Sequence, residues 1–236
     1  MNLIKKATYA AEKVYKQNQL PNMNPDNYRC DILLLNILCN EDIYLDSRAF
    51  KKDLCGMLIL DEDEKTLVYN SNQSQTRRNF TIGHELGHYF LHREKKSQFR
   101  DRTKDILDNT INEFEMQANA FASQLLLPNF FLYNLIGNGY HFYQIYRQTQ
   151  ISKQALYWRL VNYLIDIHKL EKLLAEKIVK EFQDFSIASM KNLVHHKWSP
   201  IYALILNNTH PIRTGIEFAR DSRGEIIGIK SMKFVT

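Results

Sequence analysis

The sequence is poor in cysteine and has no long hydrophobic run. Its three cysteines, Cys30, Cys39 and Cys55, form an odd set without C-x-x-C spacing. Such a set argues against a disulfide framework or a thiolate metal site and predicts reduced, mostly buried thiols. The longest apolar stretch, residues 32–39, is interrupted by Asn36 and is far too short to span a bilayer.

The sequence also lacks a signal peptide, internal repeats and low-complexity segments. Lysines and a glutamate interrupt the apolar positions of the first twenty residues, so no continuous apolar signal core is present. The chain has 236 residues, of which 44% are hydrophobic, which is ample for a buried core. We therefore expect a folded cytoplasmic protein that is neither secreted nor inserted into a membrane.

The net charge of +5 is unevenly placed along the chain. All of the excess falls in residues 151–236, which carry 13 lysines and arginines against 8 acidic residues. A basic half can contact nucleic acid or an acidic partner, but a modest excess is more often a solvated surface. Nucleic-acid binding is therefore not the favoured interpretation.

Hydrophobic periodicity and turn residues predict the elements of the first half. A charged stretch is expected to form a loop between the last two of its helices. The predicted helices are 3–15, 25–40, 75–92 and 111–127, the predicted strands are 43–45, 55–60 and 66–69, and the loop is 93–108. This pattern predicts an α+β fold with a mostly helical core and a small antiparallel sheet.

Beyond Pro128 the chain is expected to be helical to about residue 193, with a helix–turn–helix-like hairpin at 142–165. The tail has three segments of strand-like alternation, at 201–206, 216–219 and 225–229. We predict three parts: a first domain at 1–135, a helical segment at 136–194, and a small β-rich region at 195–236.

The segment His84-Glu85-Leu86-Gly87-His88 carries the most specific signal in the chain. It places two imidazoles four residues apart on one helical face, so that both can reach a single ion at about 2 Å. The adjacent Glu85 can take a proton from an attacking water and later pass it to a leaving amine. The motif predicts a zinc site with hydrolytic chemistry.

A catalytic zinc site needs a third protein ligand, and His92 is the nearest candidate. On a straight helix His92 lies about 12 Å of rise from His84, so the two cannot share one ion. The longer metzincin motif is also absent, because Leu91 and Glu94 stand where it needs glycine and histidine. We expect His92 to be a packing or hydrogen-bonding residue.

The next helix offers a better ligand in Glu115. Glu115 and Asn119 are four residues apart and share a face, so the carboxylate can bind zinc. Asn119 can accept the remaining ring N–H of a ligating histidine and thereby fix its tautomer. The competing carboxylate, Glu113, lies about 160° away around the helix and is expected to face elsewhere.

These residues lie in two segments that resemble the ImmA/IrrE family of gluzincin-type metallopeptidases. Residues 78–88, R-N-F-T-I-G-H-E-L-G-H, resemble the family pattern R-x-F-T-x-A-H-E-L-G-H, and residues 115–122, E-M-Q-A-N-A-F-A, resemble E-x-E-A-N-x-F-A. The departures are Gly83 for alanine and Gln117 for glutamate. The resemblance covers roughly residues 20–165, while residues 170–236 resemble nothing comparable.

The resemblance implies a zincin-like fold, a Zn²⁺ ion held by His84, His88 and Glu115, and a general base in Glu85. Family members accompany helix–turn–helix repressors of prophages, integrative elements or stress regulons, and relieve repression by cleaving or otherwise inactivating them. The expected function is therefore that of a zinc metalloendopeptidase that cuts such a repressor and so regulates transcription. The alternative is a metal-containing regulator that binds a repressor or DNA without proteolysis.

For the second half, the sequence supports two expectations and leaves one assignment open. The helical hairpin is expected to pack on the peptidase domain and not to bind DNA, because its exposed face carries Tyr157 and Trp158 and few charges. No single residue stands out as the stabiliser of the transition state, and the candidates are Tyr140, His141, Tyr157 and Arg159. The basic tail is expected to recognise the repressor through Arg213, Arg220, Arg223, Lys230 and Lys233.

Overall fold

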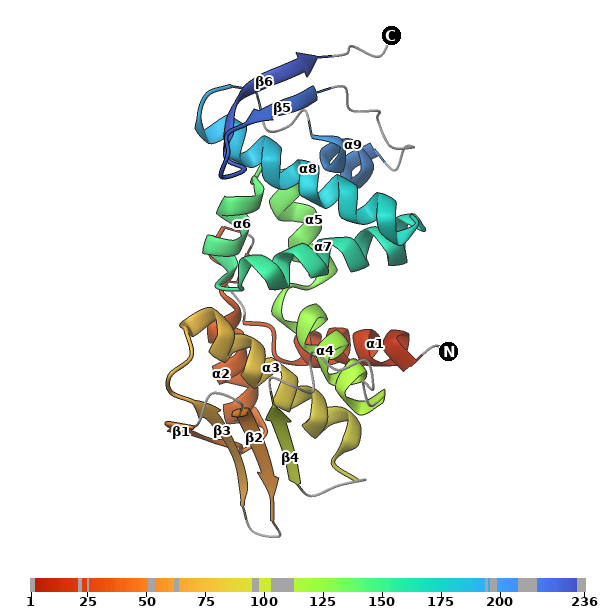
Figure 1. The fold of residues 1–236 in the computed structure, drawn as a ribbon. Coiled ribbons are helices and arrows are strands. Elements are labelled where there is room, and N and C mark those ends of the chain that lie inside the picture. Colours follow the sequence, from red (N-terminus) through yellow and green to blue (C-terminus); the bar gives the residue numbers. More distant parts are fainter. Residues whose placement is uncertain are drawn as a thin grey trace. The chain divides into compact units, whose positions relative to one another are not determined.

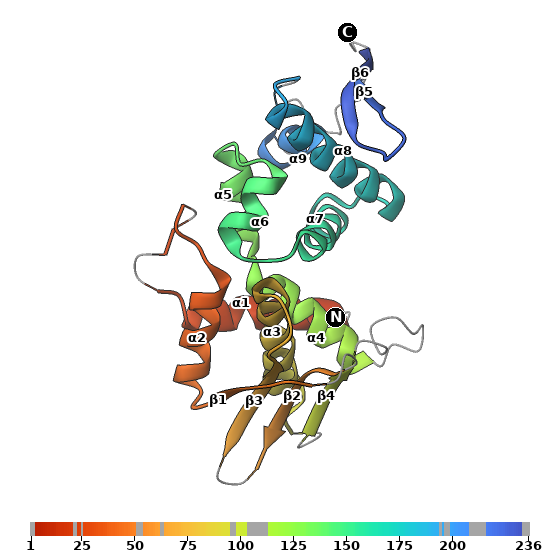
Figure 2. The same cartoon turned by 60° about the vertical axis from the view of Figure 1, so that its left-hand side comes forward.

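The fold was analysed in a computed structural model, shown in two views in Figures 1 and 2. It describes residues 3–20, 23–24, 26–50, 54–61, 64–94, 98–102, 113–193, 195, 199–207 and 216–232. The chain forms two compact units, the first of residues 1–128 and 148–155 and the second of 129–147 and 156–236. Helices and two small sheets together confirm the predicted α+β class. The three-part division expected from the sequence stays a prediction.

A four-stranded sheet of order β1-β3-β2-β4 lies in the first unit. Its strands are β1 (Tyr44–Arg48), β2 (Leu54–Leu60), β3 (Lys65–Asn70) and β4 (Gln98–Arg102). β2 runs antiparallel to both of its neighbours, whereas β1 runs parallel to β3. The expected antiparallel sheet is therefore mixed, because β1 pairs with the second strand of the β2–β3 hairpin and not with the strand that follows it.

Strand β4 corrects the prediction of a loop over residues 93–108. Its backbone pairs with β2 at one edge of the sheet, with Phe99 opposite Leu58. The charged composition of this segment concealed the strand, since an edge strand tolerates charged side chains while its backbone completes the ladder.

Among the described residues before Pro128, the helices are α1 (Leu3–Gln17), α2 (Cys30–Asn40), α3 (Gln75–His92) and α4 (Glu113–Leu126). α3 covers one face of the sheet, and α4 packs against both α3 and α1 (Figures 1 and 2). The predicted helix over 75–92 is confirmed. Helix α2 begins five residues later than predicted, because the Asn24 carboxamide oxygen accepts the backbone N–H groups of Asp26 and Asn27 in a turn.

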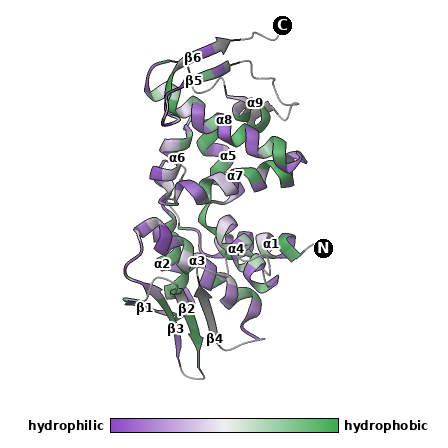
Figure 3. Ribbon diagram, viewed as in Figure 1, coloured by the Kyte–Doolittle hydropathy of each residue, from purple (hydrophilic) through white to green (hydrophobic). Residues whose placement is uncertain are grey.

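The second unit is mainly helical. Its elements are α5 (Asn129–Gly137), most of α6 (Phe142–Thr149) and α7 (Lys153–His168), α8 (Lys172–Met190), α9 (Pro200–Asn207), β5 (Ile216–Arg220) and β6 (Ile226–Met232). Figure 3 shows α8 alternating between hydrophobic and hydrophilic residues, as expected of a helix with one buried side.

Helix α9 replaces the strand predicted at 201–206. The continuous apolar run there has no helical or strand period, so periodicity could not decide between the two states. Pro200 occupies the first helical position, where its missing N–H has no cost. The helix packs against α5 and α8, with the rings of Tyr202 and Phe182 5.6 Å apart.

The predicted hairpin of the tail is confirmed as the antiparallel pair β5–β6. It packs on α8, where Ile226 shares a small core with Phe185 and Ala188. Arg220 of the hairpin adds an ion pair with the buried Asp184 of α8. The hairpin is therefore part of the second unit's core and not a free appendage.

The expectations of no membrane-spanning helix and no disulfide can be compared with the residues that the structure describes. None of the helices in that part of the chain combines the length and the apolar character that a membrane crossing requires. Cys30 and Cys55 are buried and Cys39 is exposed, and none of the three is in a disulfide. Burial raises the pKa of the Cys30 thiol, which keeps it protonated and unreactive.

Candidate metal centre

The site is built where α3 and α4 cross at very short distance. A methyl group at Gly87 would lie 2.9 Å from Cα of Ala118, so the crossing requires glycine on α3 and a small residue on α4. Ala118 is fully buried. This close approach lets side chains one turn away on either helix meet between the two backbones.

Three side chains converge at this crossing. The Nε2 atoms of His84 and His88 lie 3.0 Å apart. The Glu115 carboxylate places one oxygen 3.1 Å from Nε2 of His84 and the other 3.4 Å from Nε2 of His88. Of the histidines, cysteines and acidic residues that the structure describes, these three form the group with the spacing of a metal site.

The geometry of this triangle fits a tetrahedral zinc ion. Ligand atoms bound at about 2.0–2.1 Å in a tetrahedron are separated by about 3.3 Å, close to the three separations observed. Two imidazoles and one carboxylate are also a donor set of catalytic zinc sites, which leave a fourth position open. The residues present therefore fit a zinc ion, and they would hold it from one side.

The protonation states of His88 and Glu115 suit a cation. Burial lowers the pKa of His88 to about 4, so its imidazole is neutral at pH 7. Burial by itself raises the pKa of Glu115, but the contacts of its carboxylate with His84 and His88 outweigh this and hold the pKa below the ordinary carboxyl range. Neutral imidazoles and an ionised carboxylate are the forms that bind a metal.

Asn119 lies on α4, one turn beyond Glu115, and contacts His84. Its carboxamide oxygen is 2.9 Å from Nδ1 of His84, so it can accept the Nδ1–H and leave Nε2 with a lone pair. Glu113, the competing carboxylate, is exposed and lies outside the cluster. His92 is also outside the cluster but buried, with a hydrogen bond to His88, as expected for a hydrogen-bonding residue.

The proposed base Glu85 is fully buried beside this cluster. A methyl group at Gly56 would lie 3.2 Å from Oε1 of Glu85 and 2.4 Å from Cγ2 of Thr81. Gly56 on β2 therefore lets the sheet approach the helix closely enough to confine the carboxylate. The sequence did not single out Gly56 for this role, and the signal that could have found it is a glycine inside a strand.

Gln117 is a second residue whose role the sequence did not reveal. Its carboxamide oxygen lies 3.1 Å from Nε2 of His92. The signal for it was the departure from glutamate at this position of the resembled pattern.

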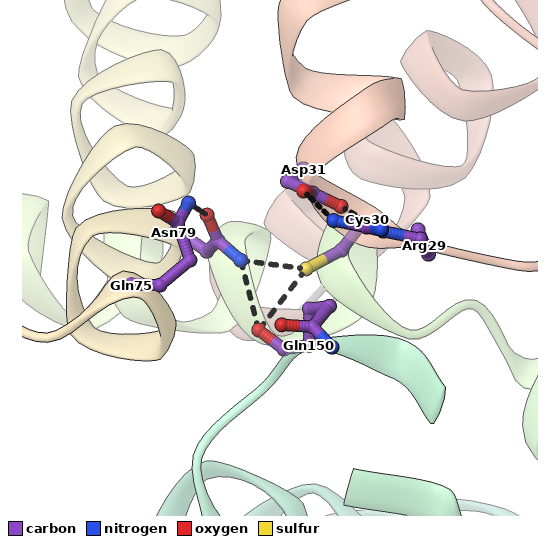
Figure 4. A network of polar contacts seen from close by, with 6 residues as sticks. All are labelled: Arg29, Cys30, Asp31, Gln75, Asn79 and Gln150. Carbon is purple, nitrogen blue, oxygen red and sulfur yellow. Dashed lines mark hydrogen bonds and ion pairs between the residues drawn. The ribbon is translucent and has the colours of Figure 1, made fainter. Parts of the chain in front are cut away.

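The turn between α6 and α7 is tied to α2 and α3 within the first unit. The backbone carbonyl of Gln150 accepts a hydrogen bond of 2.8 Å from the Asn79 carboxamide, which also contacts the Cys30 thiol (Figure 4). The Gln75 carboxamide donates a hydrogen bond to the carboxamide oxygen of Asn79. Ile151, the next residue of the turn, is only 2% exposed. The turn is therefore part of the packing of the first unit, and the packing of the rest of the hairpin stays a prediction.

The four candidates for a transition-state stabiliser all belong to the second unit. There Arg159 is buried and donates to Asn129, and the Tyr157 hydroxyl donates to the carbonyl of Glu176. The Tyr140 carbonyl accepts the Tyr202 hydroxyl at 2.8 Å. These contacts give the side chains of Arg159 and Tyr157 a structural role, and the assignment of a stabiliser stays a prediction.

An H-E-x-x-H helix that faces a glutamate on a second helix is the kind of centre that metallopeptidases use. The family model of peptidase M78, described as the IrrE N-terminal-like domain, matches residues 42–161, about half of the chain. The protein belongs to this ImmA/IrrE family of metallopeptidase type, which confirms the resemblance seen in the sequence.

Two curated relatives are similar to parts of the chain. An "Uncharacterized immunity region protein 2" of Bacillus phage phi105 is 38% identical over 78 residues, which are 33% of this chain and 47% of the relative. The metallopeptidase ImmA of Bacillus subtilis (strain 168) is 27% identical over 118 residues, 50% of this chain and 63% of the relative. The matched parts thus span about half to two thirds of these relatives.

Among solved structures, a Mycobacterium tuberculosis transcriptional regulator is similar with a TM-score of 0.45 and 17% identity. The similarity covers 66% of this chain and 46% of that chain.

Substitution of Gly87 by alanine should disrupt the helix crossing. The added methyl group would meet backbone atoms of Ala118 at 2.9 Å, so α3 and α4 must separate, at a cost of about 1–3 kcal/mol in the free energy of unfolding. Separation also moves Glu115 away from the histidines, so metal affinity should fall.

Gly83→Ala is the matched control for this experiment. A methyl group there would make contacts of 3.4–3.5 Å with the side chains of Ala122 and Leu126. Because alanine also favours helix, this variant should be neutral or stabilising. Denaturant unfolding and metal titration compare the two, and equal behaviour would contradict the role of the close crossing.

Proposed function

We propose that the protein is a zinc metalloendopeptidase in which His84, His88 and Glu115 bind Zn²⁺, Asn119 orients His84, and Glu85 is the general base. The observation that carries the proposal is the convergence of three buried or half-buried ligand atoms, all within 4.8 Å of one another, from two packed helices. Membership in a family of metallopeptidase type supports the same interpretation.

Each residue has a defined part in peptide hydrolysis. Zinc, when bound, would supply Lewis acidity that lowers the pKa of water and polarises the scissile carbonyl. Glu85 accepts the proton of the attacking water and passes it to the nitrogen of the leaving amine. Its confinement beside Gly56 limits its rotamers, so the carboxylate is oriented before substrate arrives.

The proposed substrate is a helix–turn–helix repressor of a mobile element or a stress regulon, cut in a linker or an exposed helix. The name of the phage relative, an immunity region protein, supports a substrate in the control of phage immunity. A selective substrate is also expected on physical grounds, since an unselective zinc peptidase inside a cell would damage its host. Selectivity then has to come from docking outside the cleavage site.

The tail is the proposed docking surface, but the structure changes how this should be tested. Arg220, Arg223 and Lys230 each have an acidic neighbour in the second unit, while Arg213 and Lys233 lie outside the described residues. Removal of residues 195–236 would expose the core at Phe185, so truncation would confound docking with unfolding. Charge reversal at exposed positions avoids this.

The double variant Arg223→Glu, Lys230→Glu should lower kcat/KM for the repressor about 3- to 10-fold, because both side chains are exposed and long-range attraction is lost. Cleavage of an unfolded casein-like protein should be unchanged. The matched control, Lys13→Glu with Lys16→Glu, reverses two exposed charges on α1. An equal loss in both double variants, or none in either, would rule out specific docking by the tail.

The alternative function is a metal-containing regulator that binds a repressor or DNA without cutting. It shares every proposed metal residue with the peptidase. The two are separated by mixing the purified protein with a helix–turn–helix repressor encoded beside its gene and analysing the mixture for fragments, because only a peptidase yields new termini that depend on Glu85.

A further inference from the structure

His92 and Gln117 form a hydrogen-bonded chain behind His88, on the side away from the proposed metal. Nδ1 of His88 lies 3.1 Å from Nδ1 of His92, and Nε2 of His92 lies 3.1 Å from Oε1 of Gln117. His92 is 1% exposed, and its ring packs against Phe114 at 4.7 Å between centroids. Burial and packing therefore hold the His92 ring, the middle member of this hydrogen-bonded series, in one orientation.

The protons of this chain can be arranged in one way that suits metal binding. If Nε2 of His88 offers its lone pair to the ion, Nδ1 of His88 carries the proton and donates to Nδ1 of His92. Nε2 of His92 then carries that ring's proton and donates to the Gln117 oxygen. The opposite direction would place a proton on Nε2 of His88 and block the ligand.

We infer that His92 and Gln117 are positioning residues that select the metal-binding tautomer of His88. Asn119 selects the tautomer of His84 by direct contact. The tautomer of His88 is selected by His92, which is itself oriented by Gln117. This inference rests on the metal site of the proposed function and extends it to two residues that do not touch the ion.

The carboxamide of Gln117 can either donate to or accept from His92, whereas a carboxylate could not donate. A glutamine can turn its N–H₂ toward His92 and donate, which reverses the chain and favours the wrong tautomer of His88. An ionised glutamate can only accept. Gln117→Glu should therefore tighten zinc binding several-fold, whereas Gln117→Met, which removes the acceptor at similar size, should weaken it.

Chelator competition with Zn²⁺ measures the contribution of His92 to metal affinity. His92→Leu should raise the zinc dissociation constant about 10- to 100-fold, the usual effect of losing an outer hydrogen-bond partner. His92→Asn should restore most of the affinity, because its oxygen occupies the place of Nδ1 and can accept from His88. Thermal unfolding of the metal-free variants shows whether the fold itself has changed.

Nitrogen-15 NMR of the zinc-loaded protein tests the tautomers directly. The expected spectrum has protons on Nδ1 of His88 and Nε2 of His92, with the His88 proton signal shifted or lost in His92→Leu. A proton on Nδ1 of His92, or equal zinc affinity in wild type, His92→Leu and His92→Asn, would overturn the inference. A wild-type protein that binds no zinc would instead refute the metal site of the proposed function.

Discussion

Replacement of Glu115 by alanine should abolish stable zinc binding. The variant removes the carboxylate that lies 3.1 and 3.4 Å from the two imidazole nitrogens and leaves a two-histidine site. Loss of an outer partner alone weakens zinc binding about 10- to 100-fold, so loss of a direct ligand should exceed 100-fold. Elemental analysis of the purified protein and chelator competition measure the effect.

Glu113→Ala is the control, because Glu113 is an exposed carboxylate two residues away on the same helix. It should retain one zinc per chain, as wild type is expected to do. Full zinc occupancy in Glu115→Ala, together with loss in Glu113→Ala, would overturn the ligand assignment.

Replacement of Glu85 by glutamine should stop hydrolysis while the protein keeps its fold and its metal. The amide has the shape of the carboxylate but cannot take a proton from water, so the rate of peptide cleavage should fall about 10²- to 10⁴-fold. Glu85 is fully buried and is not among the three clustered ligand residues, so neither zinc content nor thermal unfolding should show a loss.

The same variant distinguishes the proposed peptidase from the non-proteolytic alternative in cells. If derepression needs cleavage, Glu85→Gln should leave the repressor intact and repression in place. Cleavage by Glu85→Gln at the wild-type rate would contradict the role of Glu85 as general base. Relief of repression by this variant without cleavage would favour the non-proteolytic alternative.

The predicted ligand set depended on local spacing, which the sequence carries completely. His84 and His88 share a face of α3 because they are four residues apart, and Glu115 and Asn119 share a face of α4 for the same reason. Both helices were predicted within two residues of their observed ends. The structure adds that these two faces meet, because Gly87 and Ala118 allow the backbones to cross closely.

Long-range pairing decided the elements that the sequence misassigned. Residues 98–102 form a strand because β2 offers a backbone partner, and nothing within the segment encodes that partner. Residues 201–206 are helical because α5 and α8 provide a surface for an apolar helix, although the same run could have been a buried strand. Local composition was neutral or misleading in both cases.

The sequence by itself determined which chemical groups are available and to which family the protein belongs: a histidine pair with an adjacent glutamate, a carboxylate with an amide one turn away, and membership in a metallopeptidase family. Only the tertiary structure decided how those groups are supported. Gln117 reaches His92 across the α3–α4 crossing, and Gly56 brings a strand against Glu85. Helical spacing specifies which residues share one face, whereas contacts between elements depend on packing that no local pattern specifies.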